Sequence, residues 1–191
     1  MKKLLFIINP KAGVKKNKHF VDDALEIFER AGYKVGVKYT KKRADGTRIA
    51  RDYGAKADLI VCMGGDGTLN EVMQGMLEGE ISTPLGYIPA GSTNDFANSL
   101  GLRTNPKDQA EFIMETEAKS LDLGWFNGRY FVYTASAGIF TETSYSTPQE
   151  LKNRLGHFAY ILHGIREVFK IRRLKLRIET EDEVYENKYI F

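Results

Sequence analysis

The chain has 191 residues, enough for one large domain, or for one domain and part of a second, around a sizeable hydrophobic core. Its 28 basic and 25 acidic residues nearly balance, so net charge gives no argument for a nucleic-acid-binding protein. Cys62 is the single cysteine, which excludes an internal disulfide and a cysteine zinc site and predicts a reducing, cytoplasmic setting.

The first predicted element is a strand over residues 4–8, an apolar run of the kind that a sheet buries on both faces. The run is too short for the hydrophobic region of a signal peptide. No segment approaches the roughly 18 apolar residues of a membrane span, so we expect any membrane contact to be peripheral. The turn after the strand contains Asn9, Pro10, Lys11 and Gly13. By itself this turn is either a plain strand-to-helix connection or part of a ligand-binding loop.

The most informative stretch begins with a second buried strand, residues 59–63, which runs into a glycine-rich turn and then a helix. The turn contains Gly64, Gly65 and Gly67. Because these residues lack Cβ atoms, the backbone can adopt positive φ angles here and approach a ligand closely. A turn of this kind between strand and helix is typical of phosphate-binding loops, although a connection without a ligand is the simpler alternative.

The residues around these glycines predict a helix start that favours a phosphate. Thr68 is expected to cap the helix, and Glu71 would complete a capping box. A helix N-terminus carries free N–H groups and partial positive charge, which suit an anion. Asp66 fits such a turn only with a cation, a hydroxyl proton or a network of donors beside it. The combination indicates a nucleotide phosphate with a metal ion or a phosphoryl acceptor nearby.

Alternating strands and helices predict a parallel sheet with crossover helices in the N-terminal part of the chain. The expected helices are 17–31, 45–55, 68–77 and 106–114, and the further strands are 34–39 and 85–88. A third loop, after the last of these strands, contains Pro89, Gly91, Ser92, Asn94 and Asp95. Since ligands bind beyond the carboxyl ends of parallel strands, the loops after residues 8, 63 and 88 should meet at one site.

The pattern changes near Asp122, after which strands follow one another directly. We therefore predict an α/β nucleotide-binding domain over 1–122 and a β-rich domain over 123–191. Asn127-Gly128 between apolar runs predicts a hairpin with a type I′ turn. A helix with a wide apolar face is expected over 155–169.

Basic residues concentrate between 152 and 177, where lysines and arginines far outnumber acids. The stretch is either a solvated face or a peripheral surface for anionic lipid, worth about 1 kcal/mol per cation near the bilayer. A nucleic-acid partner is not expected, because the stretch lacks exposed aromatic side chains between its cations.

Four motifs resemble the diacylglycerol kinase catalytic family of lipid kinases, which is related to sphingosine kinases and NAD kinases. They are Asn-Pro-Lys-Ala-Gly at 9–13, Gly-Gly-Asp-Gly-Thr-Leu-Asn-Glu-Val at 64–72, Pro-Ala-Gly-Ser-Thr-Asn-Asp-Phe-Ala at 89–97 and Leu-Asp-Leu-Gly at 121–124. The resemblance implies a three-layer, Rossmann-like α/β domain with a parallel sheet, followed by a sandwich-like β domain. It also implies ATP and Mg²⁺ as cofactors and transfer of the γ-phosphoryl group to a lipid hydroxyl, with diacylglycerol as the expected acceptor.

The same resemblance assigns roles to residues of the three loops. Nucleotide binding would involve Asn9, Pro10, Lys11, Gly13, Gly64, Gly65, Gly67, Thr68, Glu71, Gly91, Ser92 and Asn94. Asp66, Asp95 and Asp122 would organise magnesium, directly or through waters. Asp66 could instead be the catalytic base, as the corresponding acid is in sphingosine kinases.

The resemblance also implies that the chain is the N-terminal part of a usual family member and lacks the end of its β domain. In bacterial members the missing part carries the proposed base, so activity of these residues alone stays open. A NAD kinase-like phosphotransferase and a regulatory module that binds nucleotide without turnover are the alternatives. The identity of the lipid is not fixed by the sequence, and a homodimer is compatible with it.

Overall fold

The computed structural model describes residues 1–12, 19–103, 105–126, 128–134, 174–179 and 182–189. The chain divides into two compact units, Met1–Tyr133 and Thr134–Phe191. The hairpin that follows residue 123 belongs to the first of these units. The division into domains at 122/123 stays a prediction.

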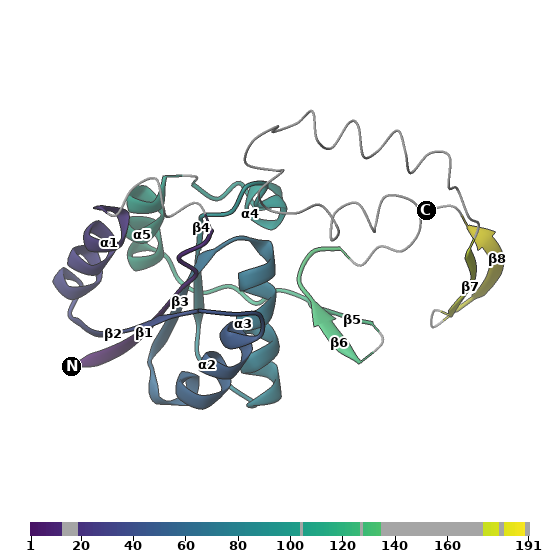
Figure 1. The fold of residues 1–191 in the computed structure, drawn as a ribbon, viewed down its shortest axis with the longest axis horizontal. Helices are drawn as coiled ribbons and strands as arrows, with labels where there is room; N and C mark the ends of the chain where they lie inside the picture. Colours follow the sequence, from purple (N-terminus) through teal and green to yellow (C-terminus); the bar gives the residue numbers. More distant parts are fainter. Residues whose placement is uncertain (13–18, 104, 127, 135–173, 180–181, 190–191) are drawn as a thin grey trace. The chain divides into compact units, whose positions relative to one another are not determined.

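A four-stranded parallel sheet forms the centre of the first unit (Figure 1). Its strands are β1 (Lys2–Ile8), β2 (Tyr33–Tyr39), β3 (Leu59–Gly64) and β4 (Leu85–Pro89). They lie in the order β2-β1-β3-β4, so the chain starts in the interior of the sheet and β2 is an edge strand. This arrangement confirms the predicted parallel sheet.

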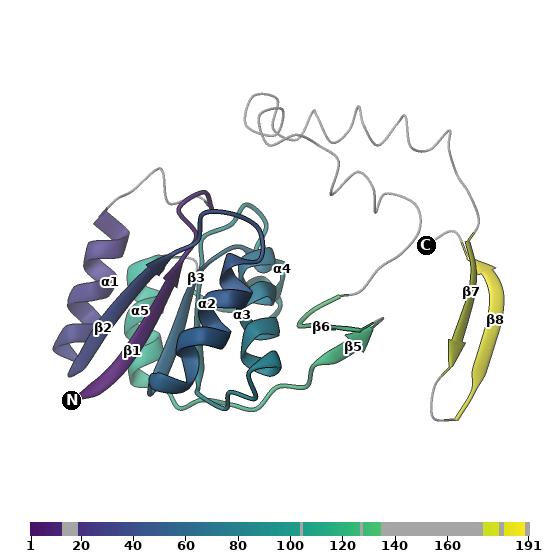
Figure 2. The same cartoon turned by 60° about the horizontal axis from the view of Figure 1, so that its bottom comes forward.

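Helices cover both faces of this sheet (Figure 2). The helices of one face are α1 (His19–Arg30) and α5 (Pro106–Glu115); those of the other are α2 (Asp45–Tyr53), α3 (Asp66–Glu78) and the short α4 (Asp95–Ser99). A 3₁₀ turn, η2 (Gly54–Lys56), continues α2. The predicted three-layer α/β fold is confirmed, with element bounds that differ by a few residues.

Alternation along β1 divides the apolar residues between two cores. Leu4, Phe6 and Ile8 face α1 and α5, and the ring of Phe6 packs edge-on against that of Phe28 at 5.4 Å. Leu5 and Ile7 face α2 and α3. Because successive side chains of a strand point to opposite faces, a strand covered on both faces must be apolar throughout.

Cys62 of β3 lies in the second core and is fully buried. Burial raises the pKa of its thiol, and the negative charge of Glu71 raises it further. The thiol is therefore a small apolar side chain of the core, as its place in an apolar run predicted.

In the described part of the chain, two antiparallel hairpins follow the sheet. In the first unit, β5 (Gly124–Phe126) pairs with β6 (Arg129–Phe131), and the Tyr130 N–H donates to Gln74 Oε1 of α3 at 3.1 Å. Gly128 has a φ of +80°, as the predicted Asn-Gly turn requires, while Asn127 lies outside the described residues.

In the second unit, β7 (Leu174–Glu179) pairs with β8 (Val184–Tyr189). The helix predicted over 155–169 and most of the basic stretch lie outside the described residues. Among the helices that are described, none has the length and apolar character needed to cross a membrane.

Helices α2 and α3 pack closely at Gly75, which is buried. A Cβ atom at this position would lie 2.9 Å from the Cα of Thr47 and closer still to the carbonyl of that residue. At Gly67, in the first turn of the same helix, a Cβ atom would meet nothing within 4 Å. The two positions offer the same substitution in one helix with opposite steric consequences.

We predict that Gly75→Ala lowers the free energy of unfolding by about 1–3 kcal/mol, because the added methyl group overpacks the contact with α2. Gly67→Ala should cause no loss, since alanine is the better helix former and has room there. Denaturant unfolding of the two variants beside the wild type measures both effects. Equal stability of the two variants would contradict the close approach of α2 and α3.

The β2–α2 loop is held by Asp45, the buried first residue of α2. Its Oδ2 accepts hydrogen bonds from the N–H groups of Lys41 at 2.8 Å and Lys42 at 3.1 Å. These donors, and then the Arg48 guanidinium, lower the pKa of the Asp45 carboxyl below its usual value of 3.8. The helix N-cap is Ala44, in the left-handed region with a φ of 66°, and its own side chain makes no capping hydrogen bond.

Because folding lowers the pKa of Asp45, its carboxylate stabilises the fold above the unfolded-state pKa, and this contribution is lost as the pH falls through the folded-state value. Asp45→Asn should therefore be less stable than the wild type at pH 6, with a smaller difference near pH 3. Denaturant unfolding at the two pH values tests this. Glu117→Gln, which removes an exposed acid, is the control, and a difference for Asp45→Asn that does not change with pH would contradict the assignment.

Candidate functional site

The carboxyl ends of the strands bring the three predicted loops together. Ile8 is in register with Met63, and the Asn9 N–H donates to the Met63 carbonyl at 2.9 Å. Gly64 is in register with Pro89, and the Ala90 N–H donates to the Gly64 carbonyl at 2.8 Å. The loops after β1, β3 and β4 therefore start side by side at one edge of the sheet, which we call the carboxyl edge.

The β1 loop is joined to α3 by a hydrogen bond between side chains. Asn9 Nδ2 donates to Thr68 Oγ1 at 2.9 Å, while Asn9 Oδ1 accepts from the Lys11 N–H at 3.0 Å. The predicted capping box is wrong: α3 begins at Asp66, its N-cap is Gly65, and no side chain caps it. The Lys11 side chain is exposed, and Gly13 lies outside the described residues.

The glycines of the β3–α3 turn allow close packing. Gly64, Gly65 and Gly67 could adopt positive φ angles, but none of them does. A Cβ atom at Gly64 would lie 2.6 Å from the Thr68 Cβ, and one at Gly91 would lie 2.6 Å from the Gly65 Cα. Two loops therefore touch through their backbones. Gly67, by contrast, is exposed and faces open space.

The first turn of α3 presents unpaired donors. The N–H groups of Thr68 and Leu69 both donate to the Gly65 carbonyl. Within the described part of the chain, the N–H groups of Gly65, Asp66 and Gly67 have no acceptor. Successive free donors at the positive end of a helix are an arrangement that commonly binds phosphate and other anions.

Asp66 connects α3 to α4. Its Oδ2 accepts from the Asp95 N–H at 3.1 Å, and its Oδ1 accepts from the Phe96 N–H at 3.2 Å. These N–H groups at the N-terminus of α4 have no partner within the helix, so the carboxylate provides their acceptor. Its negative charge also interacts favourably with the helix dipole. Of the three surroundings that the sequence allowed for this acid, the structure contains the network of donors.

The three predicted metal-organising acids do not form a cluster. The side chains of Asp95 and Asp122 are exposed, and Asp66 is engaged with α4. Among the described residues, no three His, Cys, Asp or Glu side chains come together as metal ligands. Indirect binding of a magnesium ion by these acids, through water molecules, stays a prediction.

The β4–α4 loop is closed by Asn94, which has a φ of 53°. Asn94 Oδ1 accepts from the Gly91 N–H at 2.8 Å, and Nδ2 donates to the Gly91 carbonyl at 3.1 Å. Asparagine tolerates the left-handed region better than most residues, which suits it to this turn. The exposed Ser92 hydroxyl makes no hydrogen bond to another described residue.

A fourth loop, residues 40–46, also reaches the carboxyl edge, which the sequence did not lead us to expect. The Thr40 N–H donates to the Ile8 carbonyl at 2.9 Å. Glu71 accepts from the Ala44 N–H through Oε1 at 2.9 Å and from the Gly46 N–H through Oε2 at 3.1 Å. Loops that follow the carboxyl ends of parallel strands lie at the same edge of the sheet, and β2 is one of these strands. This rule could have predicted the position of the fourth loop from the sequence.

Tyr87 of β4 contacts the end of β3, where the β3–α3 turn begins. Its hydroxyl donates to the Gly64 carbonyl at 3.1 Å. Burial raises the pKa of Tyr87, and the charge of Asp66 raises it further, so the phenol stays a neutral donor. Like Asp66 and Glu71, it positions the backbone of the edge.

Comparison with known proteins agrees with this geometry. The family model of the diacylglycerol kinase catalytic domain matches residues 3–126. The diacylglycerol kinase of Staphylococcus saprophyticus is 36% identical over 188 residues, covering 98% of this chain and 62% of that protein. For the diacylglycerol kinase of Bacillus subtilis the identity is 35% over 190 residues, covering 98% and 63%.

A crystal structure of a diacylglycerol kinase from Bacillus anthracis has the same fold, with a TM-score of 0.78 and 30% identity over 99% of this chain and 62% of that one. The chain thus spans less than two-thirds of the length of these relatives. The family match includes all four loops of the carboxyl edge. The chain belongs to the diacylglycerol kinase catalytic domain family.

Proposed function

We propose that the protein is an ATP-dependent lipid kinase that converts diacylglycerol to phosphatidic acid. In this reaction the lipid hydroxyl oxygen bonds to the γ-phosphorus of Mg·ATP, the bond to the β-phosphate oxygen breaks, and ADP leaves. The hydroxyl proton passes to a base. Such a transfer needs positioning and charge neutralisation more than covalent participation by the protein.

The row of unpaired N–H groups at Gly65, Asp66 and Gly67 carries this proposal. A phosphate placed there would accept hydrogen bonds from a backbone that is already arranged, at the positive end of α3. The open space at Gly67 gives phosphate oxygens room to approach. Chemically, this fits the polyphosphate of a nucleotide.

Side chains at the rim would complete the nucleotide site. The exposed Lys11 is a cation in the β1 loop, and the Ser92 hydroxyl is a free donor at the β4–α4 loop. Asn9, Thr68, Glu71 and Asn94 would act through the loops that they hold together.

We propose that Asp66, Asp95 and Asp122 contact magnesium through bridging water molecules. A carboxylate has about four lone-pair sites, so Asp66 can accept the two N–H groups of α4 and still receive a water or a hydroxyl proton. That capacity also supports Asp66 as a candidate base. Magnesium would arrive with the nucleotide, because Mg²⁺ is usually held by few carboxylates together with substrate phosphates.

The substrate places the reaction at a membrane surface, so we propose peripheral attachment from the cytoplasmic side through the basic stretch 152–177. Of its described members, Lys175 pairs with Glu186 at 2.7 Å and Arg177 with Glu179 at 3.1 Å. These two charges are partly neutralised, so attraction to anionic lipid would come from the remainder of the stretch.

Binding of Mg·ATP to the chain, measured by calorimetry, tests the nucleotide site. We expect Gly67→Ala to weaken binding by roughly tenfold, because its methyl group would occupy space beside the free N–H groups while the fold has room for it. Gly36→Ala on β2 is the matched control, since its Cβ also has room but lies away from the loops. Equal affinity in both variants would refute phosphate binding at α3.

Transfer of labelled γ-phosphate to diacylglycerol in mixed micelles by the complete gene product tests the reaction. Label in phosphatidic acid, reduced in Gly67→Ala, is the expected result. Label only in another acceptor, NAD included, would retain the phosphotransferase and reject the lipid. Nucleotide binding without any transfer would leave a regulatory module.

A further inference from the structure

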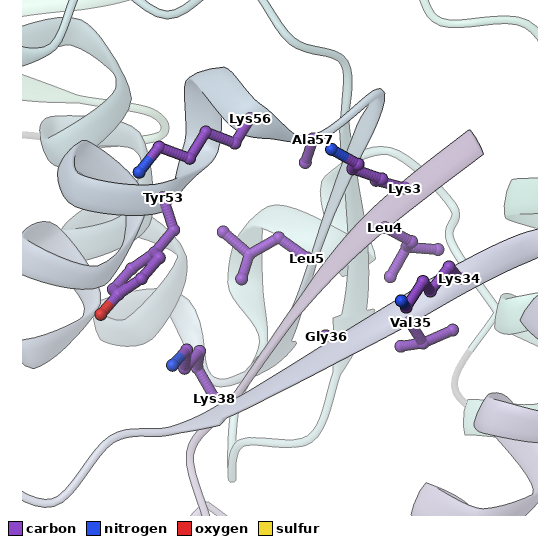
Figure 3. A pocket seen from close by; sticks show the side chains of 10 residues that line it. All are labelled: Lys3, Leu4, Leu5, Lys34, Val35, Gly36, Lys38, Tyr53, Lys56 and Ala57. Atoms are coloured by element: carbon purple, nitrogen blue, oxygen red, sulfur yellow. The ribbon is translucent and has the colours of Figure 1, made fainter. Parts of the chain in front are cut away.

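A shallow cavity of about 320 Å³ opens on the α2 side of the sheet, away from the carboxyl edge (Figure 3). Its floor is apolar and includes Leu5 and Ala57, and the ring of Tyr53 forms one wall. The volume lies at the small end of the range for ligand pockets, about 300–1,000 Å³. It suits a small molecule rather than a protein segment.

Four lysines surround this cavity: Lys3 of β1, Lys34 and Lys38 of β2, and Lys56 of η2. None of them forms an ion pair with an acid in the described part of the chain. Lys38 lies 4.4 Å from the centre of the Tyr53 ring, and Lys56 lies 6.0 Å from it. The nearby Asp58 accepts from the main-chain N–H of Lys3 at 2.7 Å. A hollow with apolar walls and charges of one sign concentrates counter-ions.

Gly36 creates the hollow. It pairs in register with Leu5 on the edge strand, between two of the lysines. A Cβ atom there would meet only the Leu4 carbonyl, at 3.8 Å, and its φ is not positive, so the fold itself does not require glycine. Glycine inside a strand weakens the strand and often marks close approach of a ligand.

Simpler explanations cover only part of this arrangement. Lysines on an edge strand discourage pairing with another sheet, which accounts for Lys34 and Lys38. It does not account for Lys3 and Lys56, which come from other elements, or for the gap at Gly36. A second copy of this chain is a poor occupant, because two such lysine clusters would repel each other.

We propose that this cavity binds one molecule of an anionic amphiphile, with a phosphate or carboxylate head among the lysines and a short apolar segment against Leu5 and Tyr53. The site is separate from the nucleotide loops, so its occupant is an additional ligand and not the ATP of the proposed reaction. Both halves of the ligand are needed: the lysines recognise the charge, and the floor buries the hydrocarbon.

Calorimetric titration of the chain with n-octyl phosphate, below its micelle-forming concentration and with saturating Mg·ATP, tests the proposal. We expect one molecule to bind per chain, at least about tenfold more tightly than inorganic phosphate or octanol. Gly36→Val should abolish this binding by filling the hollow, without lowering the thermal unfolding midpoint, because valine is favoured in strands. The double variant Lys34→Gln/Lys38→Gln should weaken it about tenfold.

Lys2→Gln is the matched control, because Lys2 belongs to β1 but contacts Tyr33 outside the cavity. Loss of binding in this variant equal to that in the double variant would refute the site. Unchanged binding in Gly36→Val would do the same. Binding to vesicles of phosphatidylglycerol but not to octyl phosphate would show only charge attraction to a surface and would overturn the pocket.

Discussion

The carboxylate of Asp66 holds the candidate site together. It belongs to the first residue of α3, yet its two oxygens accept the N–H groups that begin α4. Because both oxygens accept hydrogen bonds, the β3–α3 turn and the β4–α4 loop cannot move apart without leaving these two N–H groups unpaired. An unpaired N–H group costs about 1–3 kcal/mol when it is buried and less when it is exposed. Gly65 and Gly91 allow the approach, since a Cβ atom on either would press on the other's backbone.

Further side chains from the same helix extend this pattern. Thr68 accepts from Asn9 of the β1 loop, and Glu71 accepts from the backbone of the β2–α2 loop. The first turns of α3 therefore hold all three neighbouring loops while its own first N–H groups stay free. The side chains thus hold the loops, and the backbone N–H groups remain available for a ligand. This arrangement suits a polyphosphate, because donors that are already in position need no reorganisation when the ligand binds.

The sequence was sufficient for the sheet because apolar runs such as Leu59–Met63 can be satisfied only between two layers of helices. It also predicted that three loops meet, which follows from parallel strands alone. Capping was predicted wrongly for a physical reason. Thr68 and Glu71 have the spacing of a capping box, but their partners come from residues 59 and 25–27 positions away, which no local pattern contains.

The glycine turn shows the same limit. A run of glycines indicates that side chains are not tolerated, but the sequence does not say whether φ, a neighbouring backbone or a ligand is the cause. Here a Cβ atom at Gly64 would clash with Thr68, and one at Gly65 would lie a tight 3.2 Å from the Gly91 Cα, while Gly67 faces open space. The β2–α2 loop was missed because it has no glycine-rich motif like those of the other loops, and because Glu71, the side chain that holds it, belongs to another element.

Amide hydrogen exchange resolved by residue tests the central claim most directly. In the ligand-free chain, the N–H groups of Asp95 and Phe96 should exchange slowly, while those of Asp66 and Gly67 should exchange quickly and slow down only when Mg·ATP is added. This result would show that Asp66 joins the β3–α3 turn to the β4–α4 loop before the nucleotide binds. Fast exchange at Asp95 and Phe96 without nucleotide, or no protection of Asp66 and Gly67 with it, would contradict the account.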